Sequence, residues 1–91
     1  YKLEQNYPNP FNPSTKIAFT LPVNNKISLK VYDILGKEVR TLINGEDYVK
    51  GPHSVTWDGK NNFGASVASG TYIYKLSFNT FEKSMKMMLL K

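Results

Sequence analysis

The chain has 91 residues, which is enough for one compact domain and too few for two. It contains no cysteine, which excludes disulfide bonds and thiolate metal sites, and its longest apolar run, Met87 to Leu90, is far too short to cross a membrane. Twelve basic residues against seven acidic ones give a net charge of +5, but eleven of the twelve are lysine, so arginine-based readout of nucleic acid is not built in and we expect no nucleic-acid partner.

Residues 1–14 have the composition of an extended N-terminal segment. Four of the five prolines fall within the first 22 residues, and the stretch Tyr7-Pro8-Asn9-Pro10-Phe11-Asn12-Pro13 cannot be helical. Proline lacks an N–H group and restrains the preceding residue to extended backbone. We expect Tyr7 and Phe11 to pin this segment to the body of the domain, residues 15–91.

The body of the domain begins with alternating apolar and polar residues, the pattern of strands that are buried on one face. Two such strands are predicted, one around Ile17, Phe19 and Leu21 and one around Ile27, Leu29 and Val31. A short connection then ends at Gly36, which suits a hairpin loop that needs one residue at positive φ. Residues 37–43 break strict alternation, so we predict a bulge there or an early end to strand pairing.

The middle of the chain contains more turn-forming residues. We predict a loop carrying Tyr48 between Asn44-Gly45 and Gly51-Pro52, and a second loop over residues 58–64. Between the two loops, a strand is predicted with His53, Val55 and Trp57 on one face. Residue Val67 is expected to lie in a further short strand.

The last third of the chain has the strongest strand pattern, and it is also the most basic part of the sequence. One strand face is predicted to carry Tyr72, Tyr74, Leu76 and Phe78. A turn near Asn79-Thr80 then leads to a last strand over residues 83–91. The sum is an all-β fold, a small antiparallel immunoglobulin-like β-sandwich of six or seven strands.

Few residues are suited to catalysis or metal binding. The only histidine, His53, alternates with Val55 and Trp57 on a strand, which is typical of a packed or rim residue rather than a general base. Asp58, Asn61 and Asn62 offer oxygen ligands, but their spacing does not match a calcium loop and turn formation explains them. We therefore predict no enzymatic activity, no metal and no cofactor.

Twelve aromatic residues raise the alternative of a carbohydrate-binding platform, with Trp57 as its first candidate. Trp57 shares strand parity with Val55, however, and small sandwiches often bury one tryptophan. We therefore predict that Trp57 lies in the core, which leaves no flat ring there for a sugar to stack on.

An ordered set of motifs resembles the type A C-terminal sorting domain of the type IX (Por) secretion system. The motifs extend over nearly the whole chain. They are Asn6-Tyr7-Pro8-Asn9-Pro10-Phe11-Asn12-Pro13-Ser14-Thr15, Val31-Tyr32-Asp33-Ile34-Leu35-Gly36-Lys37-Glu38-Val39, Gly51-Pro52-His53, Val55-Thr56-Trp57-Asp58-Gly59, Ser69-Gly70-Thr71-Tyr72 and Lys86-Met87-Met88-Leu89-Leu90-Lys91. The middle of the chain is also similar to the immunoglobulin-like domain of flagellar hook-capping proteins.

The resemblance to sorting domains implies a role in export. It implies the C-terminal piece of a longer secreted protein, which reaches the cell surface through the periplasm of a Gram-negative-type envelope. The implied partners are the outer-membrane secretion machinery and a surface transpeptidase that removes the domain and anchors the cargo. The residues that correspond to the sorting signal are Gly70, Thr71, Tyr72, Lys83, Lys86, Met87, Leu89, Leu90 and Lys91.

The last strand is expected to serve both the fold and the signal. Met85, Met87 and Leu89 share one parity, whereas Met88 and Leu90 share the other, so apolar side chains point to both faces. We expect one face to pack on the core and part of the other to remain available to a receptor. Two alternatives to the sorting role are an extracellular carbohydrate-binding module and a structural subunit that self-associates weakly through its edge strands.

Overall fold

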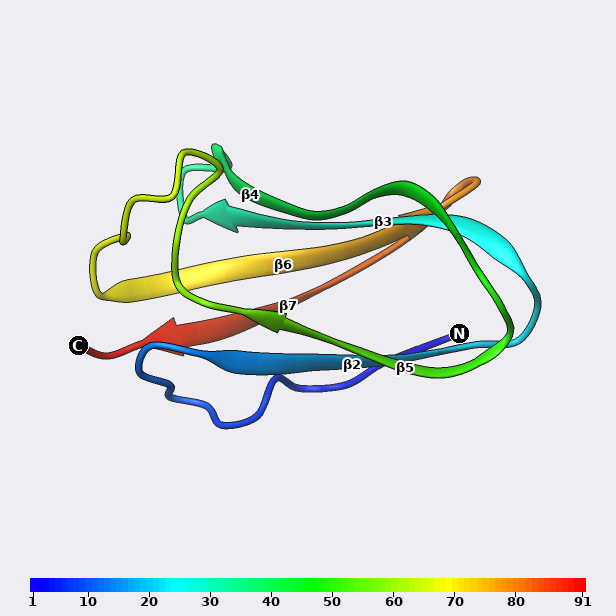
Figure 1. Cartoon of the computed structure of the whole chain (residues 1–91), viewed down its shortest axis with the longest axis horizontal. Helices are drawn as coiled ribbons and strands as arrows, with labels where there is room; N and C mark the ends of the chain where they lie inside the picture. Colours follow the sequence, from blue (N-terminus) through cyan, green and yellow to red (C-terminus); the bar gives the residue numbers. More distant parts are fainter.

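Seven β-strands in two antiparallel sheets account for most of the chain in the computed structural model, which describes all of residues 1–91 (Figure 1). The three-stranded sheet has the order β1-β2-β5 and the four-stranded sheet the order β4-β3-β6-β7. The strands are β1 (Lys2–Leu3), β2 (Thr15–Leu21), β3 (Asn25–Asp33), β4 (Glu38–Tyr48), β5 (Gly51–Trp57), β6 (Gly70–Phe78) and β7 (Phe81–Leu89). The predicted immunoglobulin-like sandwich is confirmed.

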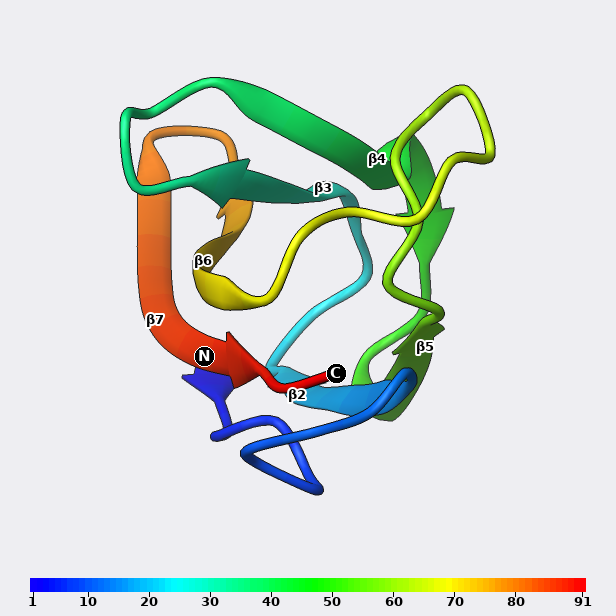
Figure 2. The same ribbon diagram turned by 90° about the vertical axis from the view of Figure 1, so that its left-hand side faces the viewer.

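The core lies between the two sheets and is built from the alternating apolar residues that define the strands. In the end-on view of Figure 2, β3 and β4 lie above and β2 lies below, with the core between them. The inward residues of β2, β3 and β6 are all buried, as their period of two predicts. They are Ile17, Phe19, Leu21, Ile27, Leu29, Val31, Tyr72, Tyr74, Leu76 and Phe78.

The strand β4 continues further than the sequence pattern predicts. The expected bulge is present, because the register between β3 and β4 shifts at several positions between Ile27 and Tyr32. Pairing does not end early, and the predicted loop around Tyr48 is wrong, because Tyr48 is the last residue of β4. Gly45 takes a positive φ of 60° inside the strand, and its N–H donates to the Ser28 hydroxyl at 2.9 Å. An edge strand can accommodate such a glycine in a bulge without ending.

The long connection between β5 and β6 contains no strand, contrary to the prediction for Val67. The chain forms one isolated bridge between Lys60 and Ser66. Val67 is half-buried and packs against the core, and its N–H donates to the carbonyl of Gly59 at 3.0 Å. The apolar character of Val67 therefore reflects its packing and not a strand.

The N-terminal segment attaches to both sheets and is more ordered than an extended arm. Strand β1 pairs with β2 in the register Leu3↔Phe19, although two residues are too few to show a strand pattern in the sequence. Phe11 is buried with 2% of its surface exposed, whereas the Tyr7 side chain is 80% exposed. The prediction that both aromatic residues pin the segment is thus right for Phe11 and wrong for Tyr7.

Candidate functional site

The two parts of the predicted sorting signal lie side by side in the structure. Strand β7 is an edge strand and pairs along its length with β6. At the end of this pairing Gly70 lies opposite Leu89, Thr71 opposite Met88, and Tyr72 opposite Met87. Residues almost twenty positions apart in the sequence therefore form one continuous patch of sheet.

The N-terminal segment holds the other edge of the same patch. The Phe11 N–H donates to the Met88 carbonyl at 3.0 Å, and the Leu90 N–H donates to the Phe11 carbonyl at 2.9 Å. The Asn9 side-chain oxygen accepts the Met88 N–H at 3.0 Å. The end of β7 thus lies between the start of β6 on one side and residues 9–11 on the other.

A shallow hollow marks the place where the three segments meet. It has a volume of about 200 Å³ and is lined by Asn9, Thr71, Lys86, Met87 and Met88. One of these residues comes from the N-terminal segment, one from the start of β6, and three from β7. We refer to this hollow and the end of β7 around it as the corner site.

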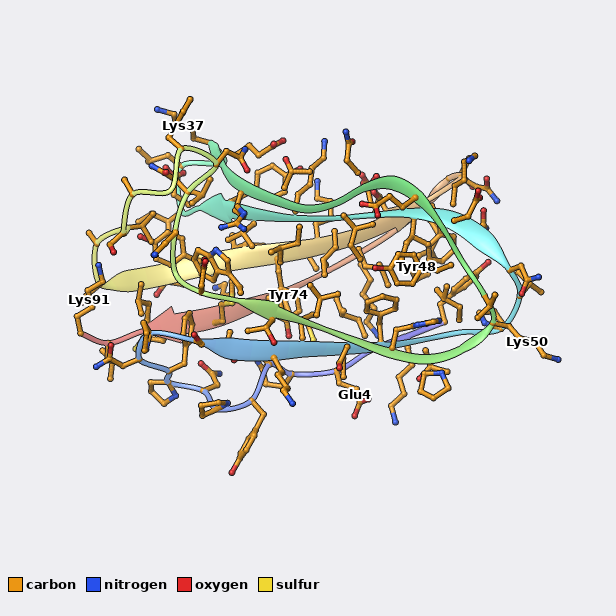
Figure 3. All side chains as sticks on the ribbon, in the orientation of Figure 1. Glu4, Lys37, Tyr48, Lys50, Tyr74 and Lys91 are labelled. Atoms are coloured by element: carbon orange, nitrogen blue, oxygen red, sulfur yellow. The ribbon has the colours of Figure 1, made fainter.

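The side chains of β7 divide between the core and the surface as the alternation predicts. Met87 and Leu89 are buried, whereas Met88 and Leu90 are 42% and 50% exposed. Lys86 and Lys91 are exposed, and Lys91, the final residue, lies at one end of the long axis of the molecule (Figure 3).

Within β7, the predicted signal lysine Lys83 differs in strand parity from Lys86. Lys83 shares the parity of the core-facing Met85 and Met87, yet its side chain is exposed because β7 is an edge strand. None of Lys83, Lys86 and Lys91 forms an ion pair; the four ion pairs of the protein involve Lys26, Lys30, Arg40 and Lys75. Lys86 and Lys91 therefore present unpaired positive charge near the corner site, and Lys83 presents it further along β7, opposite Leu76.

The residue that fixes the N-terminal segment is Asn6, which the sequence pattern did not single out. Only 2% of its surface is exposed. Its side-chain nitrogen donates to the Thr15 hydroxyl at 3.0 Å and to the Pro8 carbonyl at 3.3 Å, and the Thr15 hydroxyl donates to the same carbonyl at 2.8 Å. The available signal was the residue type, because asparagine next to a proline-rich turn often binds nearby backbone.

The hydroxyl of Tyr74 connects this segment to the core. It donates to the Glu4 carbonyl at 2.6 Å and accepts the Asn6 N–H at 2.9 Å, and Figure 3 shows Tyr74 in the middle of the sandwich. Burial raises the pKa of Tyr74 above its usual value of 10.0, and the hydrogen bond from Asn6 only partly opposes this effect.

We expect the domain to lose stability in alkali through Tyr74. Its pKa is raised in the folded state, so the stabilisation is complete below the unfolded pKa of about 10 and is lost as the pH rises through the folded value. Replacing Tyr74 by Phe should flatten this alkaline decline and cost about 1–3 kcal/mol at neutral pH, because the Asn6 N–H and the Glu4 carbonyl lose their partner. Denaturant unfolding between pH 7 and pH 11 measures both effects.

Tyr48 supplies the control for this experiment. Its half-buried ring packs on Phe19 and His53, and its hydroxyl makes no hydrogen bond within the protein. Tyr48→Phe should change neutral-pH stability by less than about 0.5 kcal/mol. An unchanged alkaline decline in Tyr74→Phe would contradict the role given to Tyr74.

Two residues considered as functional candidates take part in packing. The His53 ring lies against Phe19 and Tyr48, and its Nε2 atom is 2.6 Å from the Val49 carbonyl. Trp57 is fully buried, as predicted, and its indole N–H donates to the Lys60 carbonyl at 2.9 Å. The platform on which the carbohydrate-binding alternative relied is therefore not at the surface.

The oxygen-rich loop after β5 uses its side chains in hydrogen bonds within the loop and to strand β4. Asp58 accepts from the Arg40 guanidinium and from the Lys60 N–H, both at 3.1 Å. Asn61 accepts the N–H groups of the two residues at 63 and 65, and Asn62 accepts the Thr41 N–H at 2.9 Å. The structure brings no three His, Asp or Glu side chains together in an arrangement that could hold a metal ion.

The domain contains no helix, and therefore no helix that is long and apolar enough to cross a membrane.

Comparisons with known proteins identify a family and similar structures. The model of the FlgD Ig-like domain family matches residues 8–80. FlgD from P. aeruginosa has a similar structure, with a TM-score of 0.65 and 28% sequence identity over 82% of this chain and 57% of FlgD. No curated protein sequence matches the chain.

Two structures from Porphyromonas gingivalis share the fold over almost the entire chain. Dimeric latent PorU matches with a TM-score of 0.79 and 20% identity over 97% of this chain and 9% of PorU. PorZ, described as an essential bacterial surface component of the type-IX secretion system, matches with a TM-score of 0.62 and 22% identity over 96% of this chain and 11% of PorZ. The chain thus corresponds in size to a small part of each of these proteins.

Proposed function

The chain belongs to the FlgD Ig-like domain family, and on that premise we propose that it is a non-catalytic C-terminal sorting and anchoring domain. In this role it directs a cargo protein joined to its N-terminus across the outer membrane to the cell surface. Its partners are the outer-membrane secretion machinery, which reads the corner site, and a surface transpeptidase, for which the domain is a substrate.

The corner site is the observation that carries this proposal. A receptor that binds there can contact Asn9, Thr71 and the exposed residues at the end of β7 at the same time. The signal candidates Tyr72, Met87 and Leu89 are buried beneath this surface. Met88 and Leu90 offer apolar contact, Lys86 and Lys91 add unpaired charge next to them, and Lys83 adds a further charge along β7, opposite Leu76. An exposed apolar patch next to charged residues is typical of a surface that binds another protein.

The structural neighbours support the proposal at the level of the fold. The chain aligns over nearly its whole length with a small part of PorU and of PorZ, so in both cases the same sandwich occurs within a much larger protein. A sorting domain that is joined to a large cargo protein is likewise a small domain within a long chain.

The lysines of β7 allow a test that separates recognition from folding. We expect the combined substitution Lys83→Gln, Lys86→Gln and Lys91→Gln to reduce export of a reporter fused before Tyr1, in a host with type IX secretion. The three side chains are exposed and unpaired, so stability should change by less than about 0.5 kcal/mol for each substitution. Surface-exposed reporter is quantified on whole cells, and thermal unfolding is measured on the purified domain.

A matched set of lysines provides the control. Lys2, Lys37 and Lys50 are also exposed and unpaired, and Lys50 lies at the end of the molecule opposite Lys91 (Figure 3). Their combined change to glutamine removes the same total charge without touching β7, and export should be retained. Equal export losses in the two triple variants would reject a specific reading of the corner site.

A further inference from the structure

The first eleven residues of the chain change from one sheet to the other. Strand β1 pairs antiparallel with β2, so that Leu3 lies opposite Phe19 in the three-stranded sheet. Eight residues later Phe11 forms a parallel bridge with Leu89 of β7, in the four-stranded sheet. The N-terminal segment therefore runs beside β7 in the same direction and closes that side of the sandwich.

The two ends of the chain leave from opposite ends of the molecule. The Tyr1 ring packs on Phe78 and Phe81 beside the β6–β7 turn, with ring centroids 3.7 and 4.9 Å apart. Lys91 lies at the other end, where its N–H donates to the Ser69 hydroxyl (Figures 1 and 3). The long axis of the molecule measures 37 Å. A pull on both termini therefore acts mainly along the strands.

We infer that the domain resists tension applied between its N-terminus and the end of β7, where the corner site lies, and that this tension is carried in shear by the contact between the N-terminal segment and β7. The two segments run in parallel, so a pull on the N-terminus and a pull on the C-terminus move them in opposite directions along their common axis. In this geometry the hydrogen bonds between them are strained together, whereas a pull across the strands breaks them one after another.

Four hydrogen bonds carry this load. Two are the backbone bonds of Phe11 with Met88 and Leu90. Two come from side chains, one between Asn9 and the Met88 N–H at 3.0 Å and one from Gln5 to the Lys86 carbonyl at 2.7 Å. They are distributed over residues 86–90, in the second half of β7 and just beyond it, so no single bond bears the full tension.

Buried anchors keep the segment from sliding along β7. Phe11 inserts its ring between the sheets and packs against Trp57, with ring centroids 5.7 Å apart. Asn6 is fixed by Thr15 and Tyr74. Movement of the segment along β7 requires that Phe11 leave the core and that the buried Asn6 lose its partners, and both steps oppose sliding. This property extends beyond recognition by secretion machinery and does not depend on it.

Single-molecule pulling in two directions tests the inference. The 91-residue chain lacks cysteine, so handles can be attached at the termini or at one introduced cysteine. One experiment pulls the N-terminus against the C-terminus. The other pulls the C-terminus against Leu35→Cys, a 90% exposed position in the β3–β4 turn, which directs the force across the strands. We expect the unfolding force to be about twofold higher or more in the first direction, because forced unfolding follows the barrier along the pulled coordinate.

A pair of asparagine variants locates the load. Asn9→Ala removes the bond to the Met88 N–H and should lower the terminal pulling force more than the force from Leu35→Cys, in which this bond breaks singly. Asn12→Ala is the control, because Asn12 is exposed in the same segment and makes no side-chain hydrogen bond. Equal forces in the two directions, or equal terminal forces for the two asparagine variants, would overturn the inference.

Discussion

Replacing Phe11 by alanine is expected to lower the free energy of unfolding by about 3–5 kcal/mol, the usual cost of removing a buried phenylalanine side chain. Phe11 is 2% exposed and contacts Trp57, so the smaller residue leaves a cavity between the sheets. A domain of this size has a total stability of about 5–14 kcal/mol, and the variant therefore loses a large fraction of it. Denaturant unfolding followed by Trp57 fluorescence measures the change.

Tyr7 is the control for this substitution within the same motif. Its side chain is 80% exposed, so Tyr7→Ala should change stability by less than about 0.5 kcal/mol. The backbone of Tyr7 pairs with Lys16 in both variants and is unaffected by the side chain. If the two alanine variants were equally destabilised, the segment would be anchored by its backbone and not by the Phe11 ring.

The second large effect is expected for Gly59→Ala, which we predict to cost about 2–5 kcal/mol. Gly59 has a φ of 76°, a left-handed conformation that costs an alanine about 1–2 kcal/mol. A Cβ atom there would also lie 2.9 Å from the Pro13 carbonyl oxygen of the N-terminal segment. Relief of this contact needs a backbone shift, and such overpacking adds about 1–3 kcal/mol.

Gly64 isolates the contribution of the close contact. Its φ of 83° is nearly the same as that of Gly59, but a Cβ at Gly64 would meet no atom within 4 Å. Gly64→Ala should therefore cost only the conformational part, about 1–2 kcal/mol. Equal thermal destabilisation by the two substitutions would mean that the backbone at Pro13 moves away from the added Cβ atom at little cost in free energy.

The strands that the sequence predicted best are those that have one buried face and a neighbouring strand on both edges. Strands β3 and β6 lie inside the four-stranded sheet, so their apolar residues must alternate along the entire length. Edge strand β4 was predicted less well. Its Asn44-Gly45 dipeptide indicates a turn by composition, but the structure accommodates it in a bulge that binds Ser28.

Only part of the corner site could be predicted from the sequence. Its residues were assigned by resemblance, and their alternation along β7 was visible in the sequence. The register of Gly70 with Leu89 follows from the two-residue turn at Asn79-Thr80. The meeting of Phe11 with Leu89 was not visible, because it joins the two ends of the chain and depends on the fold as a whole. The same non-local contacts decide that Phe11 and not Tyr7 is buried, and that Asn6 finds polar partners inside the protein.

The pairing of the N-terminal segment with β7 also determines the order in which the domain can fold. Asn9 and Met88 are 79 positions apart, so this contact forms only after most of the chain has been closed into a loop. During synthesis the N-terminal segment is made first, and it cannot form these hydrogen bonds until residues 88–90 have been made. A nascent chain that lacks those residues keeps the edge of β6 unpaired, because β7 is its neighbour there. Completion of the sandwich thus coincides with the appearance of the C-terminal residues that form the corner site.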